Sequence, residues 1–447
     1  MNISDLIIDR ICGISESNIP DHINDLVKRC LIDYLGIVLA GGKESRICNS
    51  LFLDSGDFPI FGTNLKTDIL SAALINGFSA HVLEMDDGHR YGMVHPGAPV
   101  ITSVLLIAKK DGIYDPDLIT KAVVCGYETV ILLARIMQPE HKILGYHTSG
   151  TCGTIGAAMA GCVLKGLDKN EMKRVLSMAA TSSAGLLNLM DDESELKPYN
   201  IGRASMDGIA AIILGKCELS CPPDPIGGKR GFVEVLSQKN IDTISIGDEY
   251  MISGIYTKPY ASCRHCHSSI EAGMLLKNEL GLSGEDILRK IDSIIVYTYS
   301  LAINGHDHKM VFNPQSAKMS IPYSLAIALL FDETGCYGYT ENMINDNSVS
   351  ELMEKISIKE NTQYTKMCPE RRISEIMIKL IDGTTYSKRV DYPLGEPENE
   401  MSDEQIENKC KNLMKYAGIS DEKSNELIQL AKSIDVRGIM DVLSNAI

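Results

Sequence analysis

Apolar residues recur every three or four positions through most of the first 240 residues, which is the period of an amphipathic α-helix. Several of these segments are apolar on nearly all sides, which is typical of central helices with neighbours all around them. The pattern predicts helices over residues 23–39, 69–83, 100–110, 118–137, 155–165, 171–187 and 206–219.

The pattern changes from about residue 258. Residues 291–299, IDSIIVYTY, are β-branched and aromatic and predict a strand. Residues 373–380 and 384–390 predict two more strands, joined as a hairpin around Asp382-Gly383, because that dipeptide favours a tight turn. A helix is expected over residues 320–330. The stretch from residue 402 to 447 is typical of amphipathic helix, with N-caps at Ser402 and Ser420.

These elements predict a mainly α-helical protein with an inserted α+β domain. We expect residues 1–257 and 393–447 to form a large all-helical domain, and residues 258–392 to form a smaller α+β domain. A chain of 447 residues is long enough for more than one domain.

Charge and composition narrow the range of functions. Lys and Arg number 43 against 59 Asp and Glu, giving a formal charge of −16, so a nucleic-acid partner is not expected. No apolar run reaches the ~18 residues of a membrane helix, and the N-terminal sequence lacks the basic and apolar pattern of a secretory signal. We therefore expect a cytoplasmic protein without a membrane partner. An anionic substrate remains compatible, since a local cationic pocket can form within an acidic protein.

Thirteen cysteines are spread along the chain, and in a reducing compartment most would be buried thiols. Cys263 and Cys266 form a C-x-x-C motif, but no second pair at finger-like spacing accompanies it. Structural zinc is therefore not expected.

The densest group of titratable residues lies in residues 81–99, HVLEMDDGHRYGMVHPGAP. Adjacent acids beside histidines suit either metal binding or proton transfer with tuned pKa values. The alternative is a polar loop whose acids cap a helix and whose histidines face solvent. The acids, histidines and arginine of this segment are His81, Glu84, Asp86, Asp87, His89, Arg90 and His95.

Residues 145–161, GYHTSGTCGTIGAAMAG, place His147 before hydroxyl residues that can cap a helix starting near Cys152. Free amides at a helix start favour a carboxylate or a phosphate. The glycines match neither the dinucleotide fingerprint nor the Walker pattern, so a nucleotide is not expected.

Lys197 and Arg203 flank a helix start, where two cations suit a polyanionic ligand, although ordinary surface charge is the commoner explanation. A second cationic group lies after residue 257, next to a proline and a helix start, and favours function; it contains Lys258, Arg264, His265 and His267.

Tyr323 begins an apolar helix, where a buried tyrosine with a satisfied hydroxyl is the simpler explanation. Nucleophile-elbow, HExxH, EF-hand and P-loop motifs are absent from the sequence. Together, these histidines, lysines, arginines and acids could bind a small molecule with several carboxylates and move protons on it.

Six segments in this order resemble the MmgE/PrpD family. They are HVLEMDDGHRYGMVHPG, GYHTSGTCGTIGAA, KPYNIGRAS, PPDPIGGKRGF, KPYASCRHCHSSIEA and NPQSAKMSIPY. The resemblance runs from about residue 28 to the C-terminal helices. It implies a large helical domain with a smaller lid domain, a homodimer, an active site between the domains, and no required metal or organic cofactor.

The resemblance also implies which residues meet the substrate. Matched motif by motif, the catalytic candidates are Asp86, Asp87, His95, His147, Lys197, Lys258 and Tyr323. Matched in the same way, the substrate-binding candidates are Glu84, Gly88, His89, Arg203, His265 and His267. Dehydratase-like and decarboxylase-like members typically have DFDDT where this chain has EMDDG, so that Glu84 replaces an aspartate and Gly88 replaces a threonine. The substrate of those members is therefore not assumed for this chain.

We expect a cofactor-independent lyase that removes a proton next to a carboxylate in a small di- or tricarboxylate. A hydro-lyase like 2-methylcitrate dehydratase is favoured, while a cis-aconitate-type decarboxylase and an iminodisuccinate-type epimerase share its first step. In this expectation His95 or His147 acts as base, and a second histidine or Tyr323 acts as acid. Two other classes remain open: a catalytically inactive carboxylate-binding scaffold, and a metal-dependent hydrolase built on Asp87, His89 and His95.

Overall fold

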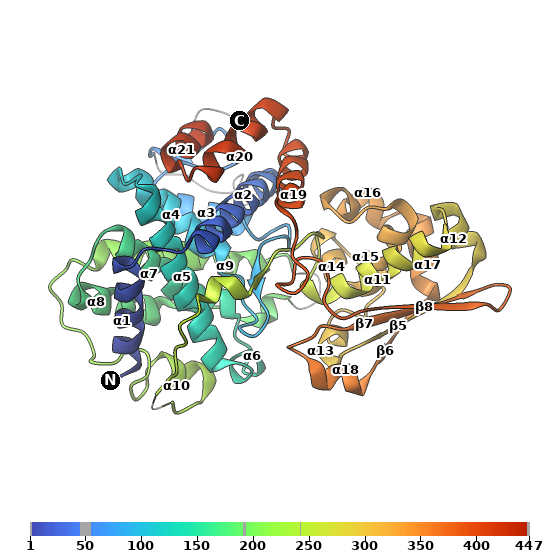
Figure 1. The fold of residues 1–447 in the computed structure, drawn as a ribbon, viewed down its shortest axis with the longest axis horizontal. Helices are drawn as coiled ribbons and strands as arrows, with labels where there is room; N and C mark the ends of the chain where they lie inside the picture. Colours follow the sequence, from blue (N-terminus) through green and yellow to red (C-terminus); the bar gives the residue numbers. More distant parts are fainter. Residues whose placement is uncertain (1, 45–54, 191–193, 242, 445–447) are drawn as a thin grey trace.

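The computed structural model describes residues 2–44, 55–190, 194–241 and 243–444 (Figure 1). The expected fold class is confirmed: the chain is mainly α-helical, with a smaller sheet-containing portion. We use "helical part" for residues 2–257 with the last three helices, and "sheet part" for residues 258–392. Among the described residues, no helix is both long and apolar enough to cross a membrane.

The helical part is a bundle around one hydrophobic core. Its helices before residue 240 are α1 (Ile3–Glu16), α2 (Asp21–Glu44), α3 (Ile69–Ser79), α4 (Gly97–Asp111), α5 (Pro116–Met137), α6 (Glu140–Ile143), α7 (Thr148–Leu164), α8 (Lys169–Ser182), α9 (Lys197–Leu214) and α10 (Phe232–Ser237).

Helix α7 runs through the centre of the bundle, and all of its residues are buried. It packs against α4, α5 and α9. At Gly156 a Cβ atom would lie 2.1 Å from Val130 Cγ2 and 2.8 Å from the carbonyl oxygen of Gly126, so only glycine fits there. The Gly- and Ala-rich sequence of α7 therefore reflects close helix packing.

The sheet part combines short helices with a four-stranded sheet. Its helices are α11 (Arg264–Leu280), α12 (Gly284–Lys290), α13 (Ser300–Ile303), α14 (Pro314–Lys318), α15 (Ile321–Phe331), α16 (Glu341–Ile344), α17 (Asn347–Lys355) and α18 (Thr362–Met367). Its strands are β5 (Ile291–Thr298), β6 (Ile356–Glu360), β7 (Ser374–Leu380) and β8 (Thr385–Val390).

The sheet has the strand order β6-β5-β7-β8. Strand β5 pairs in parallel with β6 and antiparallel with β7, so Ile294 lies opposite both Ile356 and Ile378. Strands β7 and β8 form the hairpin expected at Asp382-Gly383, and Gly383 has a φ of +88° in its turn. Helix α11 packs on β7 and β8, and α15 packs on α11, which gives this part its own core.

After β8 the chain returns to the helical part as α19 (Asp403–Tyr416), α20 (Asp421–Lys432) and α21 (Val436–Ser444). Helices α19 and α20 pack on α2, and α21 packs on α4 (Figure 1). The expected N-caps are confirmed, because Ser402 accepts a hydrogen bond from the Gln405 amide and Ser420 accepts one from the Lys423 amide.

Several helix boundaries differ from the expected ones. Helix α9 begins at Lys197 rather than near residue 206, because Pro198 suits the first turn of a helix. Helix α7 begins at Thr148, before the expected residue 155. Helices α3 and α8 end at Ser79 and Ser182, four to five residues early, where the chain turns toward the junction between the two parts.

Candidate active site

A cavity of about 90 Å³ lies where the helical part meets the sheet part. A larger hollow of about 740 Å³ adjoins it, since both are lined by Lys142, Leu187, Lys197 and His306. The polar lining of the cavity consists of Glu84, His95, Lys142, Tyr146, His147, Thr148, Lys197, Tyr256, Lys258, Cys263, Arg264, His265, His306 and Arg372.

The segment between α3 and α4 carries acids and histidines into this junction. Glu84 has a φ of +56°, a left-handed conformation that residues other than glycine rarely adopt. Such a conformation persists where the surrounding contacts hold the residue in place. Farther along, β3 (Gly88–His89) pairs with β4 (Ile255–Tyr256), which fixes this segment beside Lys258.

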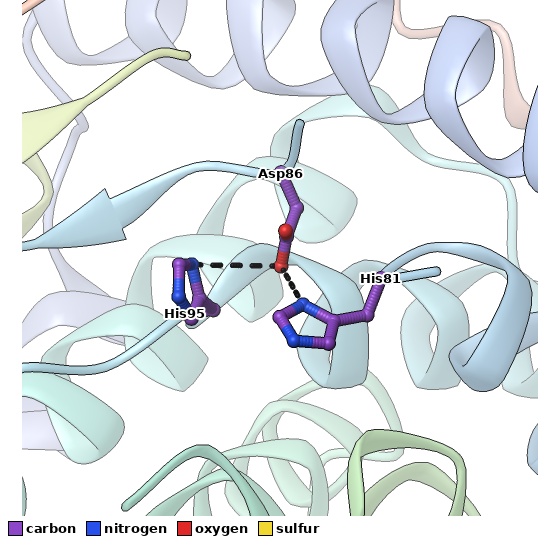
Figure 2. A group of neighbouring side chains, drawn as sticks. All are labelled: His81, Asp86 and His95. Carbon is purple, nitrogen blue, oxygen red and sulfur yellow. Dashed lines mark hydrogen bonds and ion pairs between the residues drawn. The ribbon is translucent and has the colours of Figure 1, made fainter. Parts of the chain in front are cut away.

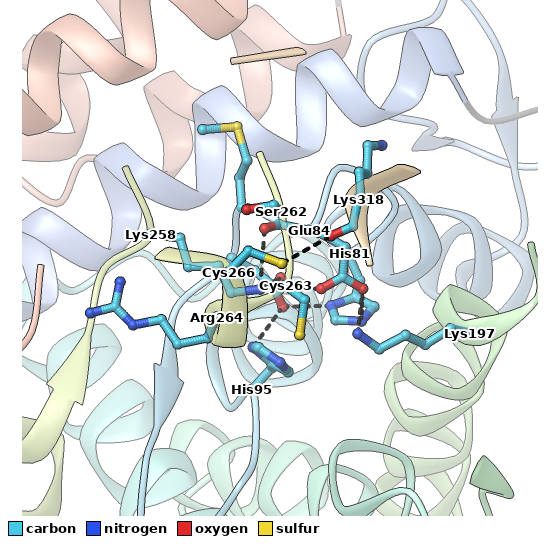
Figure 3. Close-up of polar contacts among 12 residues, drawn as sticks. His81, Glu84, His95, Lys197, Lys258, Ser262, Cys263, Arg264, Cys266 and Lys318 are labelled. Carbon is cyan, nitrogen blue, oxygen red and sulfur yellow. Dashed lines mark hydrogen bonds and ion pairs between the residues drawn. The ribbon is translucent and has the colours of Figure 1, made fainter. Parts of the chain in front are cut away.

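Glu84 is fully buried between two lysines (Figure 3). Its carboxylate accepts a hydrogen bond from Lys197 Nζ, and Lys258 Nζ lies 3.2 Å from Glu84 Oε2 and 3.1 Å from its carbonyl oxygen. Burial alone would raise the pKa of Glu84, but the two ammonium groups hold that pKa well below its usual range. Glu84 is therefore ionised.

Asp86 lies between His81 and His95 (Figure 2). Asp86 Oδ2 is 2.8 Å from His81 Nδ1 and 3.6 Å from His95 Nδ1, and Oδ1 is 3.9 Å from Lys258 Nζ. Burial opposes ionisation, but the histidines and Lys258 together lower the pKa of Asp86. With Glu84, Asp86 balances the charges of the two lysines.

His81, Asp86 and His95 also form a group that could hold a metal ion, because their donor atoms lie within 4.8 Å of one another. The fit is poor. His95 Nδ1 is 2.6 Å from the carbonyl oxygen of Asp87, so this nitrogen carries a proton, and Lys258 already neutralises the carboxylate. The expected metal set of Asp87, His89 and His95 does not form a donor group among the described residues.

His95 lines the cavity, and its Nε2 is a proton acceptor. A carbonyl oxygen can only accept, so the 2.6 Å contact with Asp87 places the ring proton on Nδ1 and leaves Nε2 with a free lone pair. Burial lowers the pKa of His95 to about 3, and nearby Lys258 acts in the same direction. The ring is therefore neutral at physiological pH.

His147 has the opposite tautomer. Asn200 Nδ2 donates to the carbonyl oxygen of Leu186 and to His147 Nδ1, each at 3.2 Å. His147 Nδ1 is thus an acceptor, and Nε2 carries the proton. Burial and the charge of Lys197 hold the pKa of His147 well below its usual range. His147 is itself the N-cap residue of α7, without a side-chain capping bond, in place of the hydroxyl residues expected there.

Gly88 leaves space for an aromatic ring rather than contacting the cavity. A Cβ atom at this position would lie 2.4 Å from the Tyr256 hydroxyl and 2.5 Å from Tyr256 Cζ. Tyr256 lines the cavity. The glycine of the EMDDG segment is therefore accompanied by a tyrosine from the neighbouring strand.

Asp87 is next to Asp86 in sequence but lies behind the cavity. Its Oδ2 accepts a hydrogen bond of 2.6 Å from the Tyr127 hydroxyl, and its Oδ1 accepts one of 3.0 Å from the Gly97 amide at the start of α4. Burial raises the pKa of Asp87 to about 7, with Asp86 adding to the effect.

Four other candidates also point away from the cavity. The Tyr323 hydroxyl donates to the carbonyl oxygen of Gly338 at 2.7 Å within the second core. Arg203 forms an ion pair with Asp207 on the outer side of α9.

The other two candidates are histidines that make local contacts. His89 Nδ1 accepts a hydrogen bond from the Gly92 amide at 3.1 Å, and His267 Nδ1 lies 2.9 Å from Arg264 Nη1.

His265 does line the cavity, and beside it lies a pair that the sequence pattern missed. The His265 and His306 rings are 5.1 Å apart, and His306 Nε2 lies 3.1 Å from Cys263 Sγ. His306 Nδ1 is held by the Asn304 carbonyl oxygen at 2.9 Å. Burial opposes ionisation of the thiol, but His306 outweighs it and lowers the pKa of Cys263 to about 6.

Lys142 and Arg372 line the same cavity, and nothing in the local sequence singles them out. Each is a basic residue without a recognisable motif around it. Only the folded chain brings them beside Lys197 and Lys258.

Two adjacent family domains match this chain. The MmgE/PrpD N-terminal domain matches residues 7–244, and the MmgE/PrpD C-terminal domain matches residues 260–434. Together they cover both the helices and the sheet part that surround the cavity.

Similar proteins include a decarboxylase-like protein, a decarboxylase and a dehydratase. The cis-aconitate decarboxylase-like protein oryM of Aspergillus oryzae is 22% identical over 99% of this chain and 97% of its own length. Cis-aconitate decarboxylase of Mus musculus is 23% identical over 90% of this chain and 84% of its own. The 2-methylcitrate dehydratase of Escherichia coli strain K12 is 29% identical over 29% of this chain and 28% of its own. The chain belongs to the MmgE/PrpD family.

Proposed function

We propose that this protein is a lyase that removes a proton from the carbon next to a carboxylate in a small di- or tricarboxylate. One observation carries the proposal: two neutral histidines with complementary tautomers face a cavity that also holds two buried lysines. The Nε2 atom of His95 carries no proton and can accept one, whereas the Nε2 atom of His147 carries a proton that it can donate. This pairing of a proton acceptor with a proton donor supports the proposal.

The first step is proton abstraction by His95. The backbone oxygen of Asp87 holds the ring proton on Nδ1 so that Nε2 can accept one, and Asp86, 3.6 Å from Nδ1, stabilises the imidazolium that forms. Negative charge brought by the substrate offsets Lys197 and Lys258. Substrate binding therefore raises the pKa of His95 and makes it a stronger base at the moment of reaction.

Lys197 and Lys258 stabilise the charge that develops on the substrate carboxylate. Each ammonium group has three N–H donors, so it can hold Glu84 and still donate to a substrate oxygen. Donors already aimed at the developing charge need no reorganisation during the reaction. Within this scheme the resulting carbanion expels hydroxide, to which the neutral His147 donates its Nε2 proton, so that water leaves and the protein acts as a hydro-lyase. The imidazolate that remains accepts the hydrogen bond from Asn200 at Nδ1 and takes a proton from water before the next turnover.

Decarboxylation is the second candidate. The relatives that align with 99% and 90% of this chain are a cis-aconitate decarboxylase-like protein and a cis-aconitate decarboxylase, whereas the 2-methylcitrate dehydratase of Escherichia coli aligns with 29%. In that reaction the donor protonates carbon after CO₂ leaves. Epimerisation would require the same proton removal with return to the opposite face.

The test is incubation of the protein in D₂O with citrate, 2-methylcitrate, cis-aconitate and aspartate-derived diacids, followed by NMR. Dehydration gives alkene signals, decarboxylation gives CO₂ and a product one carbon shorter, and epimerisation gives inversion with deuterium at one carbon. His95→Gln should lower turnover about 10²- to 10⁴-fold. Full turnover in both His95→Gln and His147→Gln would refute the assignment.

If the wild-type protein reacts with none of these acids, the result would favour a catalytically inactive carboxylate-binding scaffold. The homodimer and the cytoplasmic location also belong to this proposal, and the family resemblance supports the first. Size-exclusion chromatography with light scattering tests the dimer directly.

A further inference from the structure

Arg372 is a buried guanidinium with unused hydrogen-bond donors. It lies between α18 and β7, lines the cavity, and is 5% exposed. Its Nε and Nη1 have no hydrogen-bond partner among the described residues. The guanidinium carbon lies 5.2 Å from the centre of the Tyr256 ring, which covers one side of the group.

Three other basic groups that line this cavity have acidic partners. Lys197 and Lys258 are balanced by Glu84 and Asp86, and Arg264 Nη2 lies 3.0 Å from Glu396 Oε1. Arg372 forms no ion pair with any carboxylate of the described residues. A buried charge without a partner is costly, so its persistence points to an anion supplied from outside the chain.

Lys142, on α6, approaches the same cavity from the helical part. The described residues give it no ion pair. Burial lowers the pKa of Lys142, and the charge of Arg372 contributes in the same direction, so the two cations lie close enough to repel each other. An anion between them would relieve both the repulsion and the missing hydrogen bonds.

We propose that Arg372, together with Lys142 from the same cavity, binds a carboxylate of the substrate that does not take part in the reaction. This inference rests on the proposed function and adds a second carboxylate position, separate from the one at Lys197 and Lys258. The substrate therefore carries at least two carboxylates, one at the reacting carbon and one that bridges the helical and sheet parts. Arginine suits this role because its planar, permanently charged group matches carboxylate geometry.

The test measures binding of propane-1,2,3-tricarboxylate, a triacid without a leaving hydroxyl, by isothermal titration calorimetry. Arg372→Met removes the charge and keeps the bulk. Its affinity for the triacid should fall about 10- to 100-fold, as expected for the loss of charge-assisted hydrogen bonds. Arg372→Lys should lose part of this affinity, because it keeps the charge without the planar group.

Arg371→Gln is the matched control. Arg371 is the preceding residue, but its side chain faces Asp391 at 3.9 Å and does not line the cavity. This variant should bind the triacid like the wild type. Thermal unfolding without ligand gives a second readout, which separates an effect of Arg372→Met on the stability of the fold from an effect on binding.

Wild-type affinity in both Arg372→Met and Arg372→Lys would overturn the inference, as would absence of triacid binding to the wild-type protein. A drop in the unliganded melting temperature of Arg372→Met with unchanged affinity would show a structural role instead. On a turned-over substrate, Arg372→Met should raise KM with little change in kcat. The two proposals can fail separately. If the wild-type protein turns over none of the tested acids but Arg372→Met still lowers its affinity for the triacid, the proposed reaction is refuted and the carboxylate position is supported.

Discussion

Replacing Asp87 with asparagine should make the protein more stable at neutral and alkaline pH. In the folded protein, burial raises the pKa of Asp87 to about 7, whereas an aspartate in the unfolded chain titrates near 3.9. Between these values the folded state binds a proton that the unfolded state does not. Folding stability from this group is therefore present at low pH and lost as the pH rises toward 7.

The size of the effect follows from the two pKa values. Each pKa unit is worth about 1.4 kcal/mol, so a rise from about 3.9 to about 7 corresponds to about 4 kcal/mol. Asparagine has the same shape and cannot ionise, and its amide oxygen can accept from Gly97 as the carboxylate does at 3.0 Å. Asp87→Asn should therefore exceed wild type by up to about 4 kcal/mol above pH 7, and by little near pH 4.

The assay is urea unfolding followed by circular dichroism across about pH 4 to pH 8. The difference between variant and wild type is the useful quantity, because other titrating groups cancel in it. Asp86→Asn is the internal control, since His81, His95 and Lys258 hold the pKa of Asp86 below its usual range against the effect of burial. That variant should be less stable than wild type by a nearly constant amount from about pH 8 to pH 4, because the stabilisation from ionised Asp86 is lost only below about pH 4. A stability difference for Asp87→Asn that does not change with pH would refute the reasoning.

Three further outcomes are expected. Glu84→Gln leaves Lys197 and Lys258 without their shared carboxylate, so the free energy of unfolding in urea should fall by about 3–5 kcal/mol. An unchanged unfolding midpoint would show that Glu84 does not stabilise the two buried lysines. Alkylation of Cys263 by iodoacetamide, followed by peptide mass spectrometry, should reach half its maximal rate near pH 6, and His306→Gln should move that point upward. Tyr323→Phe removes a buried hydrogen bond to Gly338 and should lower the free energy of unfolding by about 1–3 kcal/mol while leaving kcat unchanged. A large fall in kcat would show that the Tyr323 hydroxyl takes part in the reaction.

The fold follows from sequence patterns wherever local preference and packing agree. The hairpin between β7 and β8 was predictable because Gly383 takes up a φ of +88° in its turn, between strands rich in β-branched residues. Strand β6 was not predicted, since ISIKE is short and partly polar, and its partner β5 is about 60 residues away in sequence. Parallel pairing of that kind is decided by tertiary contacts.

The candidate site follows from sequence only where its members are clustered. Glu84, Asp86 and His95 lie within twelve residues, and their density indicated a site. Lys142 and Arg372 are 230 residues apart in sequence, and each alone is indistinguishable from a surface charge. These two residues become candidates for the site only because the folded chain brings them to the same cavity, which no local sequence pattern predicts.

Asp86 and Asp87 show why even a clustered motif does not assign roles. Both are adjacent acids in one segment, and the family resemblance treats them alike. The backbone turns their side chains in different directions, so that Asp86 meets two histidines and a lysine while Asp87 meets a phenol and a backbone amide. His81, His95 and Lys258 lower the pKa of Asp86, while burial raises the pKa of Asp87, from the same starting value. The acid placed to stabilise a charged histidine is therefore Asp86, while Asp87 contacts His95 through its carbonyl oxygen, which places the ring proton on Nδ1.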